Sequence, residues 1–262
     1  MLRTLYDYRW FIWSSVKRGF QSRYYTSMIG VAWLVLQPLA MILVYTLVFS
    51  QLMRARLVGL ETNSFSYSIY LCSGILTWNF FTDIINRGQV LFIENANLIK
   101  KLKFPKICLP TILGISAVLD FALIFGLFLI FLGVSGNFPG WSFFSFFPVL
   151  CIQLFFALGL GITLGVLNVF FRDVRQLMMI VLQLWFWVTP IVYPVATLPQ
   201  WVQKLLLFNP MAAFIEAYQA IFVYDKWPVL STLWPGFLCA VFFCWLGMHL
   251  FRRHMTDLVD EL

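Results

Sequence analysis

Charge is scarce in this chain. Asp, Glu, Lys and Arg make up 11% of its 262 residues, whereas 61% are hydrophobic. A soluble domain carries about 25% charged residues, so this composition excludes an ordinary soluble domain. The apolar residues gather in long stretches, and about 20 of them in one helix cross a bilayer. We therefore expect an all-α integral membrane protein. Six membrane-spanning helices are predicted, at about 29–50, 67–88, 107–132, 146–170, 177–194 and 229–250.

Residues that carry chemistry are also few. His249 and His254 are the only histidines, and the five cysteines form no CxxC pair. The chain has no Walker A lysine motif, no GxSxG and no HExxH. We therefore expect no catalytic residue, no bound metal and no cofactor in this chain. If it transports a large cargo, another chain must supply the ATPase.

Acidic residues are fewer than basic ones, 11 against 18, and the basic ones are placed unevenly. The predicted connectors alternate between the two sides of the membrane. On the side that does not hold the two chain ends there are only four Lys and Arg residues: Arg54, Arg56, Lys204 and Lys226. The positive-inside rule then predicts that both termini are cytoplasmic. The net charge of +7 is read as this topology signal and as contact with anionic lipid, not as nucleic-acid binding.

Three parts are predicted along the chain: a cytoplasmic segment at 1–28, a transmembrane domain at 29–254 and a cytoplasmic tail at 255–262. Residues 4–21 suit an amphipathic helix, with Trp10 and Trp13 on its apolar side. That pattern fits either a helix lying flat on the membrane interface or a simple aromatic anchor.

Two short apolar patterns, 198–207 and 210–223, follow the fifth predicted span and flank Asn209-Pro210. Each is too short to cross a bilayer, so the pair is predicted to dip into the outer leaflet as a re-entrant hairpin. Glu216 lies within it.

Other ionisable residues fall inside the predicted spans. Asp83 and Arg87 are four apart and so share one helix face. They form either a local structural pair or part of a conformational switch. Asp120 stands alone in an apolar run, which makes it a functional candidate, although it can also bond to a neighbouring helix.

The connector between the second and third predicted spans suits a short helix at 94–103, with Glu94 in its first turn and lysines in its last. Pro105 ends it. The basic end anchors the chain at the membrane, or the exposed Leu98, Ile99 and Leu102 dock another protein.

Several segments, taken in order, resemble the membrane subunit of ABC-2-type polysaccharide exporters, nearest the O-antigen branch of Gram-negative bacteria. They are Ser27–Trp33 followed by Pro38, Ser73-Gly74 with Trp78, Asn95–Pro105, Asn168–Asp173, Thr189–Pro194 and Asn209-Pro210. The resemblance covers essentially the whole chain.

The resemblance implies a homodimer in the bacterial inner membrane with two separate nucleotide-binding subunits, which bind ATP and magnesium. The implied cargo is a glycan on a polyprenyl pyrophosphate, and residues 94–104 are the implied coupling helix. The residues expected to contact the ATPase subunit are Glu94, Asn95, Asn97, Leu98, Lys100, Lys101, Lys103 and Phe104.

Aromatic residues make up 19% of the chain. Many belong to the interfacial belts of any membrane protein. A conduit for neutral sugar is also well lined by aromatic faces, on which apolar sugar faces slide. The candidates for such a lining are Trp33, Tyr45, Phe49, Trp185, Trp187 and Tyr193. Two other functions stay open: an ATP-independent flippase for lipid-linked glycan, and an integral-membrane glycan-processing enzyme.

Overall fold

The computed structural model describes residues 6–24, 65–101 and 104–254, together with the isolated positions 36, 40, 43 and 44. Every regular element in these ranges is a helix, and they contain no strand. This confirms the all-α prediction. Apart from the four isolated positions, the first predicted span, with Trp33, Tyr45 and Phe49, lies outside the described residues, and so do Leu102, Lys103 and the tail.

The helices differ in length and fall into two groups. The long ones are α2 (Arg9–Tyr24), α4 (Ser66–Glu94), α6 (Cys108–Val134), α7 (Phe146–Phe170), α8 (Asp173–Val188), α10 (Pro210–Tyr224) and α11 (Trp234–Arg253). The short ones are α5 (Ala96–Lys101), α9 (Gln200–Leu206) and the 3-10 turns η2 (Trp141–Ser145), η3 (Val195–Thr197) and η4 (Leu230–Thr232).

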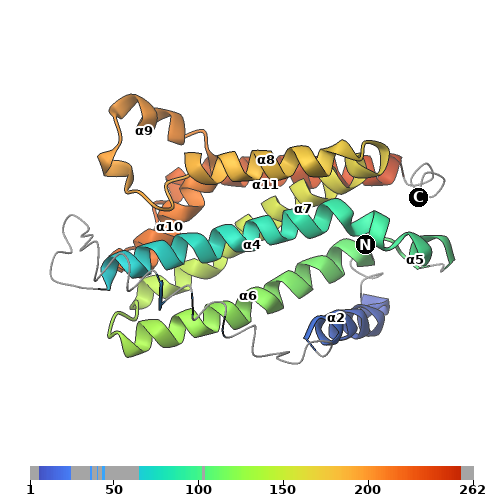
Figure 1. Cartoon of the computed structure of the whole chain (residues 1–262), viewed down its shortest axis with the longest axis horizontal. Helices are drawn as coiled ribbons and strands as arrows, with labels where there is room; N and C mark the ends of the chain where they lie inside the picture. Colours follow the sequence, from blue (N-terminus) through green and yellow to red (C-terminus); the bar gives the residue numbers. More distant parts are fainter. Residues whose placement is uncertain are drawn as a thin grey trace.

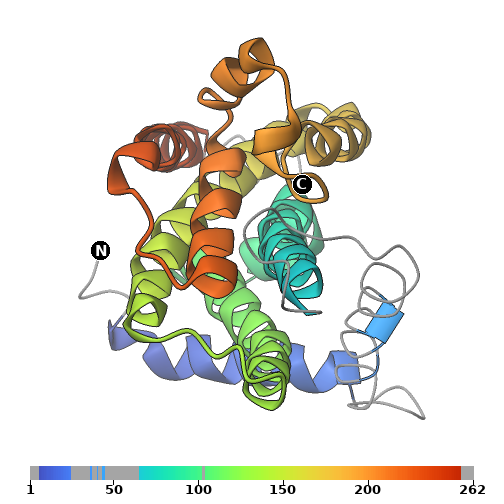
Figure 2. The same cartoon turned by 90° about the vertical axis from the view of Figure 1, so that its left-hand side faces the viewer.

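Helices α4, α6, α7, α8 and α11 run along the long axis of the molecule (Figure 1). At one end α5 projects beyond them, and α9 and α10 lie at the other end. We call these the α5 end and the α9 end. Helix α2 lies across the axis beside α6, as the view along the bundle shows (Figure 2). If the bundle crosses a membrane, a helix in this orientation lies parallel to the membrane plane.

Helix α7 is the centre of the bundle, because it contacts α4, α6, α8, α10 and α11. Its glycines face two neighbours. A Cβ on Gly159 would lie 2.5 Å from the Cys244 nitrogen of α11, and one on Gly88 of α4 would lie 2.7 Å from the Gly161 Cα. Small residues four apart let membrane helices approach this closely. The apolar core of the bundle therefore rests on backbone-to-backbone contact.

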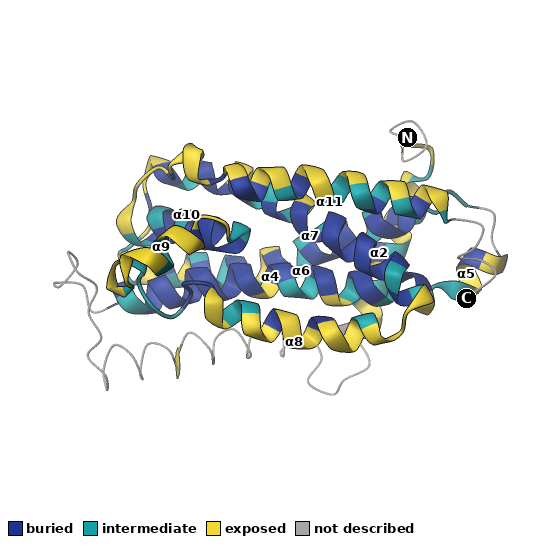
Figure 3. Ribbon diagram, turned by 90° about the horizontal axis from the view of Figure 1, so that it is seen from above, coloured by how far each residue is buried: buried dark blue, intermediate teal, exposed yellow. Residues whose placement is uncertain are grey.

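Outside this centre, apolar side chains point outward. Helix α8 buries only Met178 and Leu182, and Figure 3 shows exposed residues along most of its length and along one side of α11. Such an outer surface suits lipid or another membrane protein. Three helical segments in the described residues are long and apolar enough to cross a membrane, namely α6, α11 and Trp141–Phe170, and the bent α9–α10 pair is a possible fourth.

Helix α8 corrects the fifth predicted span, 177–194. It begins at Asp173 and ends at Val188. The prediction ran on to Pro194, but Pro190 has no backbone N–H to donate and disfavours the helical conformation of Thr189. At 16 residues α8 extends about 24 Å.

Two sequence predictions about the α5 end were wrong. Glu94 is the last residue of α4 and not the first turn of the short helix, which begins at Ala96 and is described as far as Lys101. Ile99, expected to be exposed, is 7% exposed and packs with Phe92 and Leu109. The short helix is therefore fixed to the bundle by one apolar side chain.

Helix α2 has two apolar faces, of which the tryptophan face was predicted from the sequence. Ile12 and Val16 are buried against Cys108 of α6, whereas Trp10 and Trp13 are 71% and 55% exposed. The tryptophan face, predicted to be the membrane-facing side, thus points away from the protein. The helix has one face for the bundle and a second apolar face that is free to enter a lipid interface.

Candidate functional site

The backbone break after α8 is held by side chains from two other helices. The Tyr67 Oη donates to the Val192 carbonyl at 2.7 Å, and the Tyr70 Oη donates to the Tyr193 carbonyl at 2.9 Å, both from α4. Gln219 of α10 donates through Nε2 to the Pro190 carbonyl at 3.3 Å. Irregular backbone at membrane depth needs such partners. This explains how the Thr189–Pro194 segment persists inside an apolar bundle.

Asn209 joins this break to the start of α10. Its Oδ1 accepts from the Trp185 indole at 2.8 Å and from the Met211 backbone N–H at 3.1 Å, and its Nδ2 donates to the Thr189 hydroxyl at 3.2 Å. Asn is a favoured N-cap and Pro a favoured first helical residue. Helices α9 and α10, bent by 100° to each other, therefore turn at a fixed point.

A second polar network connects three helices in the core. The Gln153 Nε2 of α7 donates to the Thr77 carbonyl of α4 at 2.9 Å, and its Oε1 accepts from the Tyr218 hydroxyl of α10 at 2.6 Å. Gln153 and Tyr218 are both fully buried. Because a lost partner would leave the amide oxygen unsatisfied, this network holds α10 in one register against α4 and α7.

We predict that Tyr218→Phe will lower the stability of the purified protein by about 1–3 kcal/mol, the cost of a buried acceptor without a donor. Tyr193→Phe is the matched control, because the Tyr193 hydroxyl donates to the Trp187 carbonyl at an exposed site. Thermal unfolding in detergent measures both. Equal losses in the two variants would contradict a special role for the buried network.

The aromatic candidates at this break are not equivalent. Trp185 is packed inside, with its ring centroid 5.5 Å from that of Phe81 and 6.2 Å from that of Trp78. Trp187 is 62% exposed, and the Tyr193 hydroxyl donates to the Trp187 carbonyl at 2.8 Å. Trp187 is thus open at the surface and Tyr193 is half-buried, whereas Trp185 supports the break.

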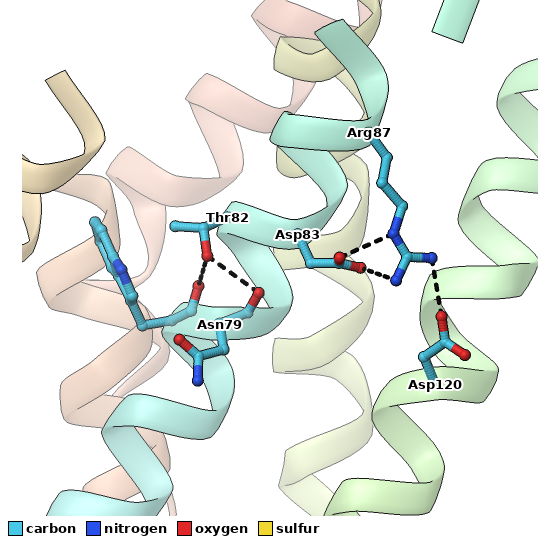
Figure 4. A network of polar contacts seen from close by, with 6 residues as sticks. Asn79, Thr82, Asp83, Arg87 and Asp120 are labelled. Carbon is cyan, nitrogen blue, oxygen red and sulfur yellow. Dashed lines mark hydrogen bonds and ion pairs between the residues drawn. The ribbon is translucent and has the colours of Figure 1, made fainter. Parts of the chain in front are cut away.

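Three ionisable residues predicted separately come together between α4 and α6 (Figure 4). Arg87 holds Asp83 in a fork, with Nε to Oδ1 and Nη2 to Oδ2 both at 2.8 Å. Its Nη1 lies 2.8 Å from Oδ2 of Asp120, whose side chain is 10% exposed. This last contact is an ion pair, and its geometry does not make it a hydrogen bond. One guanidinium therefore joins α4 to α6.

The cluster is reached from the α5 end. A cavity of about 670 Å³ between α2, α4 and α6 is lined by Arg87 together with Arg18 and Ser15 of α2 and Glu94. Arg87 thus faces a partly polar space and not only the apolar core. The sequence indicated the Asp83–Arg87 pair, but a partner for Asp120 required the third dimension.

Glu216 of α10 faces a different space, at the α9 end. It lines a pocket of about 440 Å³ with Gln200, Gln203 and Lys204 of α9. Figure 1 shows α9 standing over this end of the bundle. The bend at Asn209 brings these polar groups together. From the sequence alone they were known only to lie on two consecutive segments.

The α5 end carries the predicted docking residues. Glu94, Asn97, Leu98 and Lys100 are exposed, and Asn95 is half-buried. Lys101 ends α5. Phe104 packs on Phe11 of α2, with ring centroids 5.4 Å apart, so it fixes α2 to the connector instead of facing outward.

The turn between α7 and α8 adds residues that sequence reasoning did not assign to docking. A groove of about 390 Å³ is lined by Glu94 and Ile93 of α4 and by Arg172 and Arg175 after α7. Phe171 in this turn is 66% exposed. The signal was present in the Asn168–Asp173 segment, but only the fold places it beside the end of α4.

No group of three His, Cys, Asp or Glu side chains that could hold a metal occurs within the described part of the chain. The five cysteines are all free, and Cys72 and Cys108 are buried. The ordered features are thus a helix projecting at one end, a braced break at the other and polar groups between them.

Comparison with known proteins identifies the family of this chain. The family model for ABC-2 type transporters matches residues 11–223. An O-antigen export system permease protein of Myxococcus xanthus is 30% identical over 100% of this chain and 99% of its own. One of Klebsiella pneumoniae is 30% identical over 77% and 75%, and a polysialic acid transport protein of Escherichia coli is 20% identical over 76% of each. The chain belongs to the ABC-2 type transporter family.

Proposed function

We propose that this chain is the membrane subunit of an ATP-driven exporter of polyprenyl-pyrophosphate-linked polysaccharide of the O-antigen type. The observation that carries the proposal is similarity along the full length of a permease named for O-antigen export. The geometry supports it, since a projecting α5 and a groove at the same end offer a docking surface for a separate ATPase. ATP and magnesium would bind in that partner.

The proposed assembly contains two copies of this chain and two ATPase subunits in the bacterial inner membrane. Each copy would cross the membrane six times with both termini in the cytoplasm. The uneven distribution of Lys and Arg supports this orientation. The α5 end would then be cytoplasmic, and α9 and α10 would form the re-entrant pair at the outer surface.

The docking surface would combine α5 with the turn after α7. Lys100 and Lys101 provide positive charge at the end of α5, and Leu98 is an exposed apolar contact in the same helix. Arg172 and Phe171 extend the surface on the other side of Glu94. An apolar centre with a charged rim is the usual composition of a protein interface.

We predict that the double variant Lys100→Glu and Lys101→Glu will reduce co-purification of the ATPase subunit about tenfold, because like charge at an interface costs more than 1 kcal/mol. The control is Lys204→Glu on α9, at the opposite end of the bundle. Quantitative mass spectrometry of the purified complex gives the ratio of the two subunits. An unchanged ratio in the double variant would exclude α5 as the docking site.

Deleting this chain tests the proposed function itself. Cells without it should lose the polysaccharide from their surface and accumulate it, still linked to lipid, on the cytoplasmic side. Restoring the intact chain should reverse both changes. If the surface polysaccharide persists and none accumulates inside, the chain is not its exporter. If polysaccharide reaches the surface but its structure changes, a glycan-processing enzyme is the better interpretation.

A further inference from the structure

Helix α4 shows an inverted pattern for a helix in a membrane protein. It buries its apolar residues almost completely, and the residues it leaves open along its middle are polar. Asn79 and Asn86 are exposed, Thr82 is half-buried, and the side chain of Asp83 is 38% exposed. At 100° per residue Asn79, Thr82 and Asn86 share one face, and Asp83 lies at its edge on the side of Arg87. The face runs for about two turns of the helix.

Such a face is costly against lipid, because hydrocarbon offers no hydrogen-bond partner to an amide or a hydroxyl. Polar residues in membrane helices therefore face protein or a water-filled space. Asp83 satisfies this rule through Arg87, and the Thr82 hydroxyl donates to backbone carbonyls of its own helix. Within the described residues, the side chains of Asn79 and Asn86 make no hydrogen bond.

A groove runs beside this face. It has a volume of about 290 Å³ and lies between α4 and α8, lined from α4 by Thr82, Asn86 and Trp78. From α8 it is lined by Gln183 and by the apolar side chains of Met179, Leu182 and Phe186. The Gln183 amide also makes no hydrogen bond within the described residues. Figure 4 shows Asn79 and Thr82 on the side of α4 turned away from Asp120, so this groove is separate from the ion-pair cluster.

We propose that Asn79, Thr82, Asn86 and Gln183 line the water-filled path along which the glycan moves. Uncharged amides donate and accept hydrogen bonds, as sugar hydroxyls do. They exchange such bonds with water at small net cost, so they guide a sugar chain without trapping it. This inference rests on the proposed function, and it assigns the guiding role to amides of α4 and α8 beside the aromatic candidates.

Water access tests the groove independently of any cargo. In membranes, a hydrophilic methanethiosulfonate reagent should modify Asn86→Cys and Gln183→Cys at least about tenfold faster than Leu123→Cys, since a thiol in lipid does not ionise. Leu123 lies on α6 and is 44% exposed within an apolar surface. Mass spectrometry of each peptide separates these sites from the five native cysteines. Equal, slow reaction at all three positions would overturn the aqueous path.

Cargo dependence tests the glycan as occupant. The reaction at Asn86→Cys should be slower in cells that make the polysaccharide than in cells that cannot, and an unchanged rate would overturn glycan as the occupant. The double variant Asn86→Leu and Gln183→Leu should reduce export about tenfold while the ATPase subunit still co-purifies. Normal export in that variant would also overturn the proposal. If deletion of the chain leaves export intact, the proposed function fails, whereas the labelling result still decides whether the groove holds water.

Discussion

Replacing Gly165 or Gly159 of α7 by alanine will lower the stability of the folded protein by about 3 kcal/mol. A Cβ on Gly165 would collide with the backbone carbonyl of Gly88, and one on Gly159 would lie 2.5 Å from the Cys244 nitrogen. These neighbours are backbone atoms of α4 and α11, so whole helices must separate to admit one methyl group. Overpacking in a well-packed core costs about 1–3 kcal/mol and occasionally more.

The close contacts are reciprocal, which is why we expect effects at the upper end of that range. A Cβ on Gly247 of α11 would lie 2.8 Å from the Gly159 carbonyl, and one on Gly88 would meet Gly161. Helix α7 is thus held between two glycine contacts on opposite sides. Neither neighbour can move away without losing its own packing on α7.

Gly126→Ala on α6 is the matched control, because a Cβ there meets nothing within 4 Å. It should be neutral or slightly stabilising, since alanine favours a helix by up to about 1 kcal/mol over glycine. Size-exclusion chromatography of the detergent-solubilised protein, followed by thermal unfolding, compares the variants. Gly159→Ala and Gly165→Ala proteins as stable as Gly126→Ala would contradict the packing described for α7.

Arg87→Ala will also destabilise the protein strongly. The substitution leaves the carboxylates of Asp83 and Asp120 without the guanidinium that lies 2.8 Å from each. Removing one partner of a fully buried ion pair costs about 3–5 kcal/mol. Asp120 is only 10% exposed, whereas Asp83 is 38% exposed and stays partly hydrated, so we expect a smaller loss of about 2–3 kcal/mol. Since Arg87 connects α4 to α6, the loss should appear as reduced folded protein before any effect on transport is measured.

A triple variant separates this electrostatic explanation from simple loss of packing. Adding Asp83→Asn and Asp120→Asn to Arg87→Ala removes the negative charges of both carboxylates and should recover most of the lost stability. Lys226→Ala, at an exposed position near the α9 end, is the control for removing a cation. Failure of the triple variant to recover, with the control unaffected, would show that the arginine stem and not its charge holds α4 to α6.

The helices were largely predictable from local signals. The apolar run at 146–170 coincides with α7, because a helix that is apolar all round needs no partner to be identified. The boundaries that failed depend on single residues. Thr189-Pro190 ended α8 early, and α4 continued to Glu94 because nothing in its sequence ends it sooner.

The candidate sites were predictable only as lists of residues. Asp83 and Arg87 are four apart on one helix, so their pairing follows from sequence. The Arg87–Asp120 contact joins separate helices and depends on how α4 packs against α6. The polar face of α4 was missed for a similar reason. Asn79 and Asn86 carry no charge, and only their exposure beside α8 distinguishes them from buried amides such as Gln153.

Transport into inside-out membrane vesicles tests the central claim most directly. Vesicles that contain this chain and its ATPase subunit should move lipid-linked polysaccharide, extracted from the same cells, into the lumen only when ATP is supplied. Transport should stop when either subunit is omitted. Transport that continues without ATP would support a flippase acting alone, and transport that continues without this chain would contradict the account.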